Sequence, residues 1–453
     1  GLVVSEMCIR DRLCCLTSFP LWSYNVNMIV EHYSVDQGLP NNTVNCTLKD
    51  RDGFIWFGTW YGLCCFDGVK FKTFNKQEHD SDVPPRKIQR IVEDKNGYIW
   101  VKTIDRKLYV FNKVTECFHA VYDDMKNYSE NIQVIKLQNT AEGDVLLLTK
   151  DKNLLLTGVD EKGQVTIKIL FDSRDEINKH DYTLKHHVLC ETEEYISWIG
   201  TDYKVSAVHK GAELASRPAD FITSKINSGD KDSFTSFFED GRKVWVGDRA
   251  GIFYSIDVRT GLVNRYVLSE IKGAISNLLV TPAGYVYLSV AGQGTYEYDL
   301  AERRLQKINT EMNDAMVTHA FIDQYDKIWF HENEKALIYY DPLNHTAKRF
   351  PFTMFGKITT LYSEDAGERG LFFLSPAGEA WLFDREHAEM VYINKLKQLS
   401  NDRANQQFYH LMLDNDGVLW LSSADEGVYC MNFPKKQFNL LSLSPQSAGQ
   451  ENY

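Results

Sequence analysis

The sequence lacks paired metal-binding cysteines and the signatures of the common catalytic folds. Nine cysteines are scattered along 453 residues and none forms a Cys-x-x-Cys pair, so a cysteine-based metal site is excluded and a disulfide framework is disfavoured. There is no Gly-x-Ser-x-Gly elbow, phosphate-binding loop or His-Glu-x-x-His helix. The adjacent Cys64 and Cys65 are expected to point to opposite faces of a strand, as small apolar side chains. We therefore expect no metal, no cofactor and no catalytic residues.

A basic block and a long apolar run are also missing. Lys and Arg are spread along the chain, and the formal net charge is -12, which argues against nucleic acid or an anionic membrane face as the main partner. No stretch approaches the roughly 18 apolar residues that a membrane helix needs. Aromatic residues make up 13% of the chain and no low-complexity tract occurs, which indicates a packed globular protein.

The two ends of the sequence differ in character from the rest. Residues 1–12 resemble translated sequencing-adapter read-through, so we expect them not to be native. Residues 13–25 resemble the tail of a signal-peptide apolar region, the alternative being a buried strand or a disordered end. Residues 444–453 form a polar linker that we expect to be truncated. These features predict a periplasmic protein.

What the sequence does contain is a repeated strand motif centred on tryptophan. Residues 52–59 read DGFIWFGT, residues 96–103 read NGYIWVKT, and residues 416–423 read DGVLWLSS. Nine anchor positions follow one another at intervals of 42–52 residues, and they are Trp56, Trp100, Leu146, Trp198, Trp245, Tyr287, Trp329, Phe372 and Trp420. Each unit is rich in Ile, Val, Phe and Tyr between Asp, Asn and Gly turns, as expected for four short strands. The period predicts an all-β propeller of about nine four-stranded units.

The first unit shows how the motif is interpreted. Strands are predicted at residues 43–49, 54–59, 63–66 and 70–74. The Asp-x-Asp-Gly sequence at residues 50–53 is interpreted as a hairpin turn, because the longer ligand series of an EF-hand is absent. The recurring Trp is interpreted as core between adjacent blades, the alternative being a platform for stacking sugars.

Residues 37–44 (QGLPNNTV), followed by DGFIWFGT and YGLCCFDG, resemble the two-component regulator propeller repeat. The resemblance spans about residues 28–443. It implies the periplasmic sensor region of a hybrid two-component system, in which two seven-bladed propellers precede a membrane helix and a histidine kinase. This chain resembles only the N-terminal part of such a protein, since no kinase motif is found in it.

The resemblance favours a division of the repeats. A first propeller would cover residues 26–355, and residues 356–443 would be further blades that either start a second propeller or close a ring. An undivided ring of eight or nine blades is the alternative. The strand predicted at residues 28–33 precedes unit one and would close a ring by pairing with a later blade.

The function implied is an extracytoplasmic sensor that binds glycan-derived oligosaccharides, controls polysaccharide-utilisation genes, and acts as a homodimer through the full-length receptor. Sugars favour aromatic faces and bidentate polar groups. The turn between the second and third strands and the connection between blades share one face of a propeller. Candidate ligand-binding residues on this face are Trp60, Tyr61, Arg86, Arg106, Tyr203, Arg249, Gln293, His319 and Gln407.

Two other functions stay open. A protein-interaction scaffold would present a broad apolar or charged patch. A propeller glycosidase or lyase would bring carboxylates, or a His and a Tyr, together in the central channel. The acidic residues of this sequence are explained by turns, so we expect the fragment not to be an enzyme.

Overall fold

The computed structural model describes residues 29–74, 84–126, 133–150, 153–171, 189–192, 194–199, 204–211, 221–225, 234–308, 317–332, 335–355, 362–365, 370–375, 380–392 and 408–432. The segments predicted as residues 1–12, 13–25 and 444–453 lie outside the described residues. The described helices and strands are almost all strands, and no described helix is long and apolar enough to cross a membrane.

The described strands form nine antiparallel sheets of four strands each, which we number as blades along the chain. Blade 1 comprises β2 (Val44–Lys49), β3 (Ile55–Thr59), β4 (Gly62–Phe66) and β5 (Phe71–Phe74). Blade 2 comprises β6 (Ile88–Glu93), β7 (Ile99–Thr103), β8 (Leu108–Asn112) and β9 (Cys117–Ala120). Blade 3 comprises β10 (Val134–Asn139), β11 (Val145–Thr149), β12 (Leu154–Val159) and β13 (Val165–Phe171).

The middle of the chain repeats this arrangement. Blade 4 comprises β14 (Leu189–Glu191), β15 (Tyr195–Ile199), β16 (Lys204–His209) and β17 (Phe221–Lys225). Blade 5 comprises β18 (Phe234–Glu239), β19 (Lys243–Asp248), β20 (Ile252–Asp257) and β21 (Val263–Val267). Blade 6 comprises β22 (Ile275–Val280), β23 (Tyr285–Val290), β24 (Gly294–Asp299) and β25 (Arg304–Lys307).

The last blades differ only in how the ninth is completed. Blade 7 comprises β26 (Val317–Ile322), β27 (Ile328–Glu332), β28 (Ala336–Asp341) and β29 (Thr346–Pro351). Blade 8 comprises β30 (Tyr362–Asp365), β31 (Leu371–Leu374), β32 (Ala380–Asp384) and β33 (Glu389–Tyr392). Blade 9 comprises β34 (Phe408–Leu413), β35 (Val418–Ser423), β36 (Val428–Asn432) and the N-terminal β1 (Ile29–Tyr33). Short helices at η1 (Val35–Gln37), α1 (Tyr122–Met125) and η4 (Phe352–Phe355) complete the described elements.

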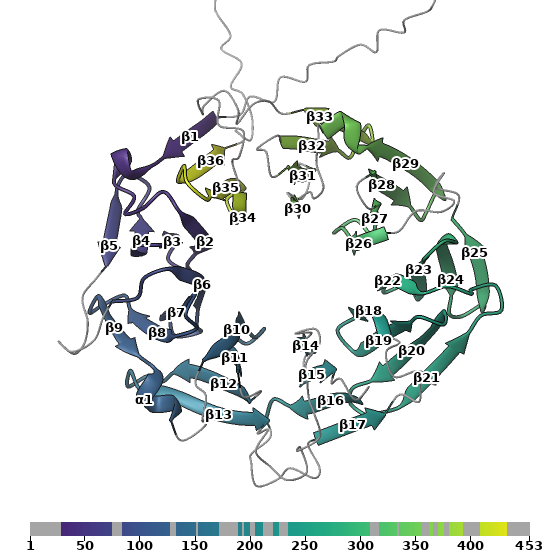
Figure 1. Cartoon of the computed structure of the whole chain (residues 1–453), viewed down its shortest axis with the longest axis horizontal. Helices are drawn as coiled ribbons and strands as arrows, with labels where there is room; N and C mark the ends of the chain where they lie inside the picture. Colours follow the sequence, from purple (N-terminus) through teal and green to yellow (C-terminus); the bar gives the residue numbers. More distant parts are fainter. Residues whose placement is uncertain are drawn as a thin grey trace, which may run out of the picture.

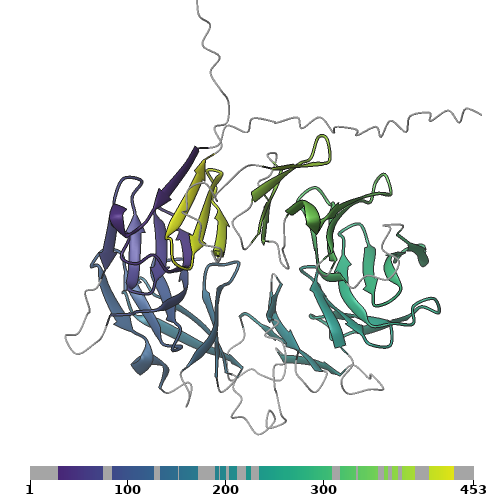
Figure 2. The ribbon, with the colours of Figure 1, turned by 45° about the horizontal axis from the view of Figure 1, so that its top comes forward.

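The blades stand around one central opening, with the first strand of each unit innermost (Figure 1). Strand β1 pairs with β36 in antiparallel register, from Ile29 opposite Asn432 to Tyr33 opposite Val428. The pairing covers the outer edge of β36 and joins the two ends of the repeat array, which is the ring closure that the strand at residues 28–33 allowed. Figure 2 shows the same sheets tilted forward, with β1 beside the C-terminal blade.

A hydrophobic cluster fills every interface between neighbouring blades, including the interface between blades 9 and 1. At that closing interface the ring of Trp420 lies 5.8 Å from Phe57 and 6.0 Å from Phe66. The described blades therefore pack on one another in chain order around the central opening, and blades 8 and 9 lie between blade 7 and blade 1. The favoured boundary at residue 355 stays a prediction.

The anchor residues lie where the repeat placed them. Each stands on the second strand of its blade and is at most 5% exposed, the three substitutes Leu146, Tyr287 and Phe372 included. This confirms that the recurring Trp is core between blades and not a sugar platform. The neighbours Cys64 and Cys65 pack toward blade 9 and blade 2 respectively, on opposite faces of β4 as expected.

Candidate functional site

In five blades, an Asp of the turn between the first and second strands forms a bracket that holds the anchor Trp. In blade 1, Asp50 Oδ1 accepts hydrogen bonds from the backbone N–H of Asp52 (3.0 Å) and Phe54 (2.9 Å). Its other oxygen accepts from Trp56 Nε1 at 2.7 Å. The same indole-to-carboxylate bond, at 2.7–3.2 Å, recurs in the pairs Trp100–Asp94, Trp245–Asp240, Trp329–Asp323 and Trp420–Asp414. These carboxylates are therefore structural, which confirms the interpretation of the sequences as turns.

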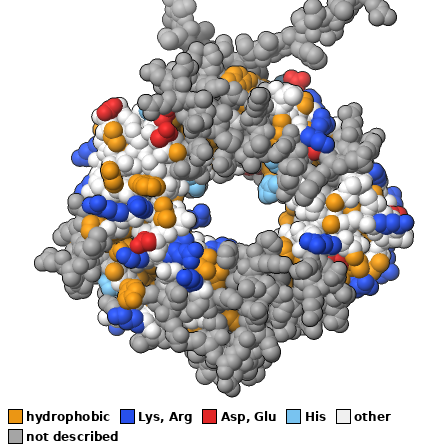
Figure 3. Space-filling model, in the orientation of Figure 1, with side chains coloured by type: hydrophobic (Ala, Val, Ile, Leu, Met, Phe, Trp, Pro, Cys, Tyr) orange, Lys and Arg blue, Asp and Glu red, His pale blue; other side chains and the backbone are white. Residues whose placement is uncertain are grey.

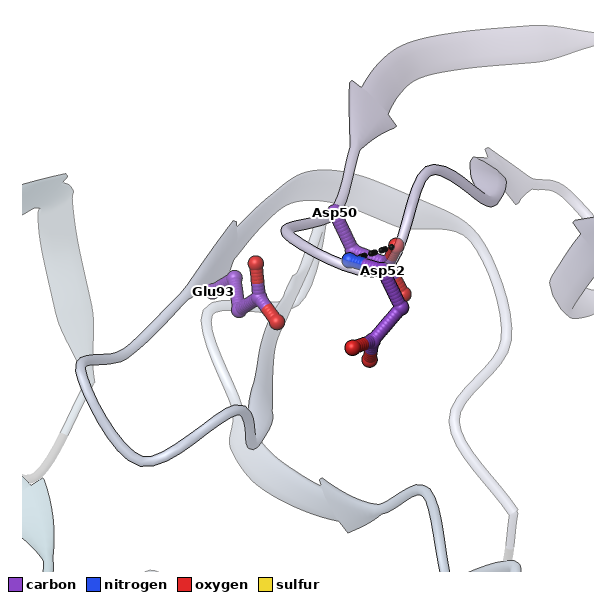
Figure 4. A group of neighbouring side chains, drawn as sticks. All are labelled: Asp50, Asp52 and Glu93. Atoms are coloured by element: carbon purple, nitrogen blue, oxygen red, sulfur yellow. Dashed lines mark hydrogen bonds between the residues drawn. The ribbon is translucent and has the colours of Figure 1, made fainter.

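One of these turns belongs to a cluster of three carboxylates, Asp50, Asp52 and Glu93, with the spacing of a metal site (Figure 4). The ammonium of Lys113 lies among them, with Nζ 3.0 Å, 2.6 Å and 2.8 Å from their respective oxygens. A cation from the chain itself thus balances the cluster, and Arg51 Nε adds a contact of 3.2 Å to Glu93. We interpret the cluster as an ion-pair network that ties the turn of blade 1 to blade 2.

The inner strands form the wall of the central opening, and most of the described ones contain a β-bulge. In seven blades of the described chain, a β-bulge falls at the second residue of the inner strand. A bulge re-aims the side chains around it and is common beside functional sites. Bulge residues Asn45 and Thr235 use this geometry to donate hydrogen bonds to the next blade, at Ile88 O (2.7 Å) and Ile275 O (2.6 Å).

A cavity of about 450 Å³ opens on the inner strands β34, β2, β6 and β10. Its polar lining includes Arg90, Glu93, Gln138, Asn139 and His410. Such a volume suits a small-molecule site, which typically spans about 300–1,000 Å³. Figure 3 shows the opening through the ring, with Lys and Arg side chains at its rim beside β6 and β10. The wall of the opening, as well as the face of the ring, is therefore a candidate site.

His410 is a titratable group in the cavity wall whose pKa is shifted. Burial, with a smaller effect of Arg90, lowers the pKa of His410 to about 4. Its Nδ1 atom is buried, with no hydrogen-bond partner among the residues that the structure describes. The imidazole is therefore neutral at pH 7, with Arg90 among the other residues that line the cavity.

The structure brings four of the predicted ligand-binding residues together. Trp60 and Tyr61 form the β3–β4 turn and are 41% and 64% exposed. Arg86 precedes β6, and its neighbour Lys87 donates from its backbone N–H to Trp60 O at 2.9 Å. The Lys87 ammonium also lies 5.2 Å from the centre of the Trp60 ring. Arg106 lies in the β7–β8 turn, whose Ile104 N–H donates to Lys87 O at 2.9 Å.

The other predicted residues are dispersed. Arg249 and Gln293 occupy equivalent turns of blades 5 and 6, and the Gln293 amide holds the chain before β22 through Lys272 N (2.7 Å) and Glu270 O (3.1 Å). His319 lies on inner strand β26 opposite His331. Tyr203 and Gln407 fall outside the described residues. The predicted site as a whole stays a prediction.

Sequence reasoning missed Arg90 and His410 in the cavity wall, and Lys102 on the neighbouring strand β7. Arg90 on β6 lies directly opposite Lys102 on β7. The signal for Lys102 is visible in the repeat, where NGYIWVKT has Lys at the position that DGFIWFGT fills with Gly58. For Arg90 and His410 no local motif exists, because the bulge that directs them follows from strand pairing.

Residues 38–61 match the sequence model of the family described as Two component regulator propeller. No curated protein sequence matches the chain.

Among solved structures, the chain is similar to the extracellular domain of BT4673, a protein of B. thetaiotaomicron described as a hybrid two component system. The two are 14% identical, the match covers 88% of this chain and 66% of that one, and the TM-score is 0.38. A second such domain from that organism, BT3049, is 15% identical, with 87% and 58% covered and a TM-score of 0.33. An inactive virginiamycin B lyase from Staphylococcus aureus is 13% identical, with 65% and 93% covered and a TM-score of 0.40. At these values the likenesses carry no argument about function.

The chain spans less than two thirds of the two sensor domains, at 66% and 58% of their lengths. The matched residues 38–61 run from the segment before β2 to the β3–β4 turn, and so contain the motifs on which the resemblance was noted. The family match confirms that resemblance. The chain is a β-propeller that carries a two-component regulator repeat in its first blade.

Proposed function

We propose that this chain is the ligand-sensing propeller of a hybrid two-component regulator and binds glycan-derived oligosaccharides outside the cytoplasm. The observation that carries the proposal is the two-component regulator repeat in blade 1, whose β3–β4 turn presents Trp60 and Tyr61 to solvent. Aromatic faces next to hydrogen-bonding side chains suit sugar rings, which are apolar on one side and polar at the edge. In this proposal the chain binds its oligosaccharide ligand but catalyses no reaction. It controls polysaccharide-utilisation genes through a kinase elsewhere in the full-length protein.

Signalling in the proposal requires a second copy of the receptor. A ligand shifts an equilibrium only through its different affinities for two states, so oligosaccharide binding would favour one arrangement of two protomers over another. The homodimer forms through the full-length receptor, and the membrane is reached only through segments other than the described propeller.

The test is calorimetric titration of the purified chain with a panel of oligosaccharides from plant and host glycans. One saturating site for at least one member is expected, with about tenfold or greater weakening in Trp60→Ala. Tyr122→Ala is the matched control, because Tyr122 is also exposed (55%) with a lysine ammonium 5.4 Å from its ring, but it lies on α1.

Three outcomes would contradict the proposal. Absence of binding across the panel removes the oligosaccharide ligand. Turnover of a polysaccharide by the purified chain would establish a glycosidase or lyase instead. Capture of one stoichiometric protein partner, with no sugar bound, would establish an interaction scaffold.

A further inference from the structure

Blade 2 carries a group of cations that no carboxylate among the described residues pairs with. The group, which we call the blade 2 cationic cluster, consists of Arg86, Lys87, Arg90, Lys102 and Arg106. None of the five forms an ion pair within the described chain. Elsewhere, cations such as Lys113 and Arg385 lie among carboxylates at 2.5–3.0 Å. In a protein of net charge -12, an unbalanced cluster of this size is unusual for a surface that only meets water.

Nearby carboxylates are already bound to other cations. Glu93 lines the cavity with Arg90, but its Oε1 is 2.8 Å from Lys113 Nζ and 3.2 Å from Arg51 Nε. Asp105 stands beside Arg106 and accepts a hydrogen bond from Thr103 Oγ1, with Lys107 at 3.4 Å. The positive charge of the cluster is therefore not cancelled from within blade 2.

Lys102 occupies a position at which other blades have glycine. In blade 1 this position is Gly58, where an added Cβ would come within 2.5 Å of Cys46 Sγ and 2.6 Å of Ile88 Cγ2. In blade 5 it is Gly247, where a Cβ would come within 2.4 Å of Ser236 Oγ. Blade 2 instead accommodates a lysine side chain that is only 7% exposed. Its ammonium donates to Oε1 of the bulge residue Gln89 at 2.6 Å.

Among the described residues, the buried ammonium of Lys102 has only the amide oxygen of Gln89 as a partner. Burying a charge with so weak a partner is energetically costly. Burial, then Arg106 and Arg90, lower the pKa of Lys102. Unpaired buried charges destabilise a fold and occur mainly at functional sites, where a ligand completes the pairing. An anion next to Arg90 and Lys102 would relieve the mutual repulsion of these groups.

The cavity provides the space for such an anion. Arg90 is exposed and lines the 450 Å³ cavity together with the side chains of Gln138, Asn139 and His410. An arginine fork matches the two oxygens of a carboxylate or sulfate group. Arg86, Lys87 and Arg106 extend the positive charge from the wall to the turns beside Trp60.

We infer that the blade 2 cationic cluster is the subsite for the acidic group of an oligosaccharide, with Arg90 and Lys102 binding a carboxylate or sulfate and Trp60 packing against a sugar ring. The inference rests on the proposed function and narrows its ligand class from oligosaccharides in general to acidic ones. A uronic acid and a sulfated sugar share the recognising chemistry, and the experiment separates them.

The experiment compares three tetrasaccharides by calorimetric titration of the full chain: a galacturonic acid tetramer, a sulfated galactose tetramer and a neutral galactose tetramer. At least one acidic tetramer should bind tenfold or more tightly than the neutral one, and its affinity should fall as salt is added. Arg90→Gln should remove most of this preference. Arg259→Gln is the matched control, because it removes one positive charge from the exposed β20–β21 turn of blade 5 and should leave the preference unchanged.

A second measurement reads the anion subsite without a sugar. Inorganic sulfate stabilises most proteins against heat by exclusion, so the readout is the difference between proteins. The thermal midpoint of the wild type should rise with sulfate by more than that of Arg90→Gln, whereas Arg259→Gln should follow the wild type. Equal rises in the wild type and Arg90→Gln would overturn the inference, whatever the sugars do.

The outcomes separate the inference from the proposed function. Equal affinity for the neutral tetramer and both acidic tetramers would overturn the acidic subsite and leave oligosaccharide sensing in place. Equal loss of the preference in Arg90→Gln and Arg259→Gln would show a general charge effect and overturn it too. Sulfate protection that depends on Arg90, with no tetramer bound, would instead contradict oligosaccharide sensing and leave an anion site of another class.

Discussion

Replacing Asp94 should destabilise the ring more than replacing any exposed turn aspartate. Asp94 is 1% exposed and accepts four hydrogen bonds. Its Oδ1 holds the turn through Asn96 N (2.9 Å) and Tyr98 N (3.0 Å). Its Oδ2 accepts from Trp100 Nε1 at 2.9 Å and from Val159 N, in the next blade, at 3.2 Å. One carboxylate thus joins a turn, the core and the interface between blades 2 and 3.

The expected magnitude follows from the donors that Asp94→Ala leaves unpaired. Trp100 is 0% exposed and Val159 is 3% exposed, so water cannot replace the lost acceptor at either N–H. A buried donor left without a partner costs about 1–3 kcal/mol, which gives about 2–6 kcal/mol for the two. The two N–H groups of the turn lie nearer to solvent and add less.

The assay is urea unfolding followed by tryptophan fluorescence, with the free energy extrapolated to water. Asp299→Ala is the matched control. Within the described residues, Asp299 accepts hydrogen bonds only from the turn N–H groups of Ala301 (2.9 Å) and Glu302 (3.0 Å), and from no Trp. The control should lose about 1 kcal/mol or less. If both variants lose the same amount, the bracket does not stabilise the interface and the reasoning is refuted.

Three further predictions concern the inner wall and the core. Gly58→Ala should lower the free energy of unfolding by about 1–3 kcal/mol, because the new Cβ would lie 2.5 Å from Cys46 Sγ. Urea unfolding measures this loss, and an unchanged midpoint would contradict the close contact. Burial raises the pKa of the Cys46 thiol to about 12, so iodoacetamide at pH 8 should label Cys46 only after unfolding, as mass spectrometry of native and denatured samples would show. Because burial lowers the pKa of His410 to about 4, the unfolded chain takes up a proton below pH 6.5 that the folded chain does not, so stability should fall between pH 6.5 and 4. His410→Gln should flatten this fall by on the order of 1–3 kcal/mol, and identical pH profiles would count against a buried neutral imidazole.

Much of the blade could be predicted because it depends on local signals. The four strands of unit one were expected within one residue of where β2 to β5 begin and end. Alternating apolar residues and Asp or Gly turns specify a hairpin with little help from the rest of the chain. The Asp–Trp bracket was missed although its signal is local, since six residues separate Asp50 from Trp56, Asp94 from Trp100, and Asp414 from Trp420.

The candidate site was less predictable. Trp60, Tyr61, Arg86 and Arg106 were placed on one face by the topology of a four-stranded unit, and the structure brings them to adjoining turns. Arg249 has an equivalent turn position but lies on blade 5, because a turn motif does not say which blades are neighbours across the ring. Gln293 proved to be a bridge to the chain before β22, which depends on a contact 21 residues away.

The repeat, the strands of each unit and the identity of the core anchors could be predicted from the sequence, because these follow from periodicity and from side chains within one hairpin. The tertiary structure was needed to show that β1 completes blade 9 and that each described blade packs on the next. It was also needed to show that Arg90 and His410 line one cavity, with Lys102 opposite Arg90 on β7. These features require pairing between residues as far apart as Ile29 and Asn432. Such contacts depend on loop closure and on packing between whole blades, which leave no period in the sequence.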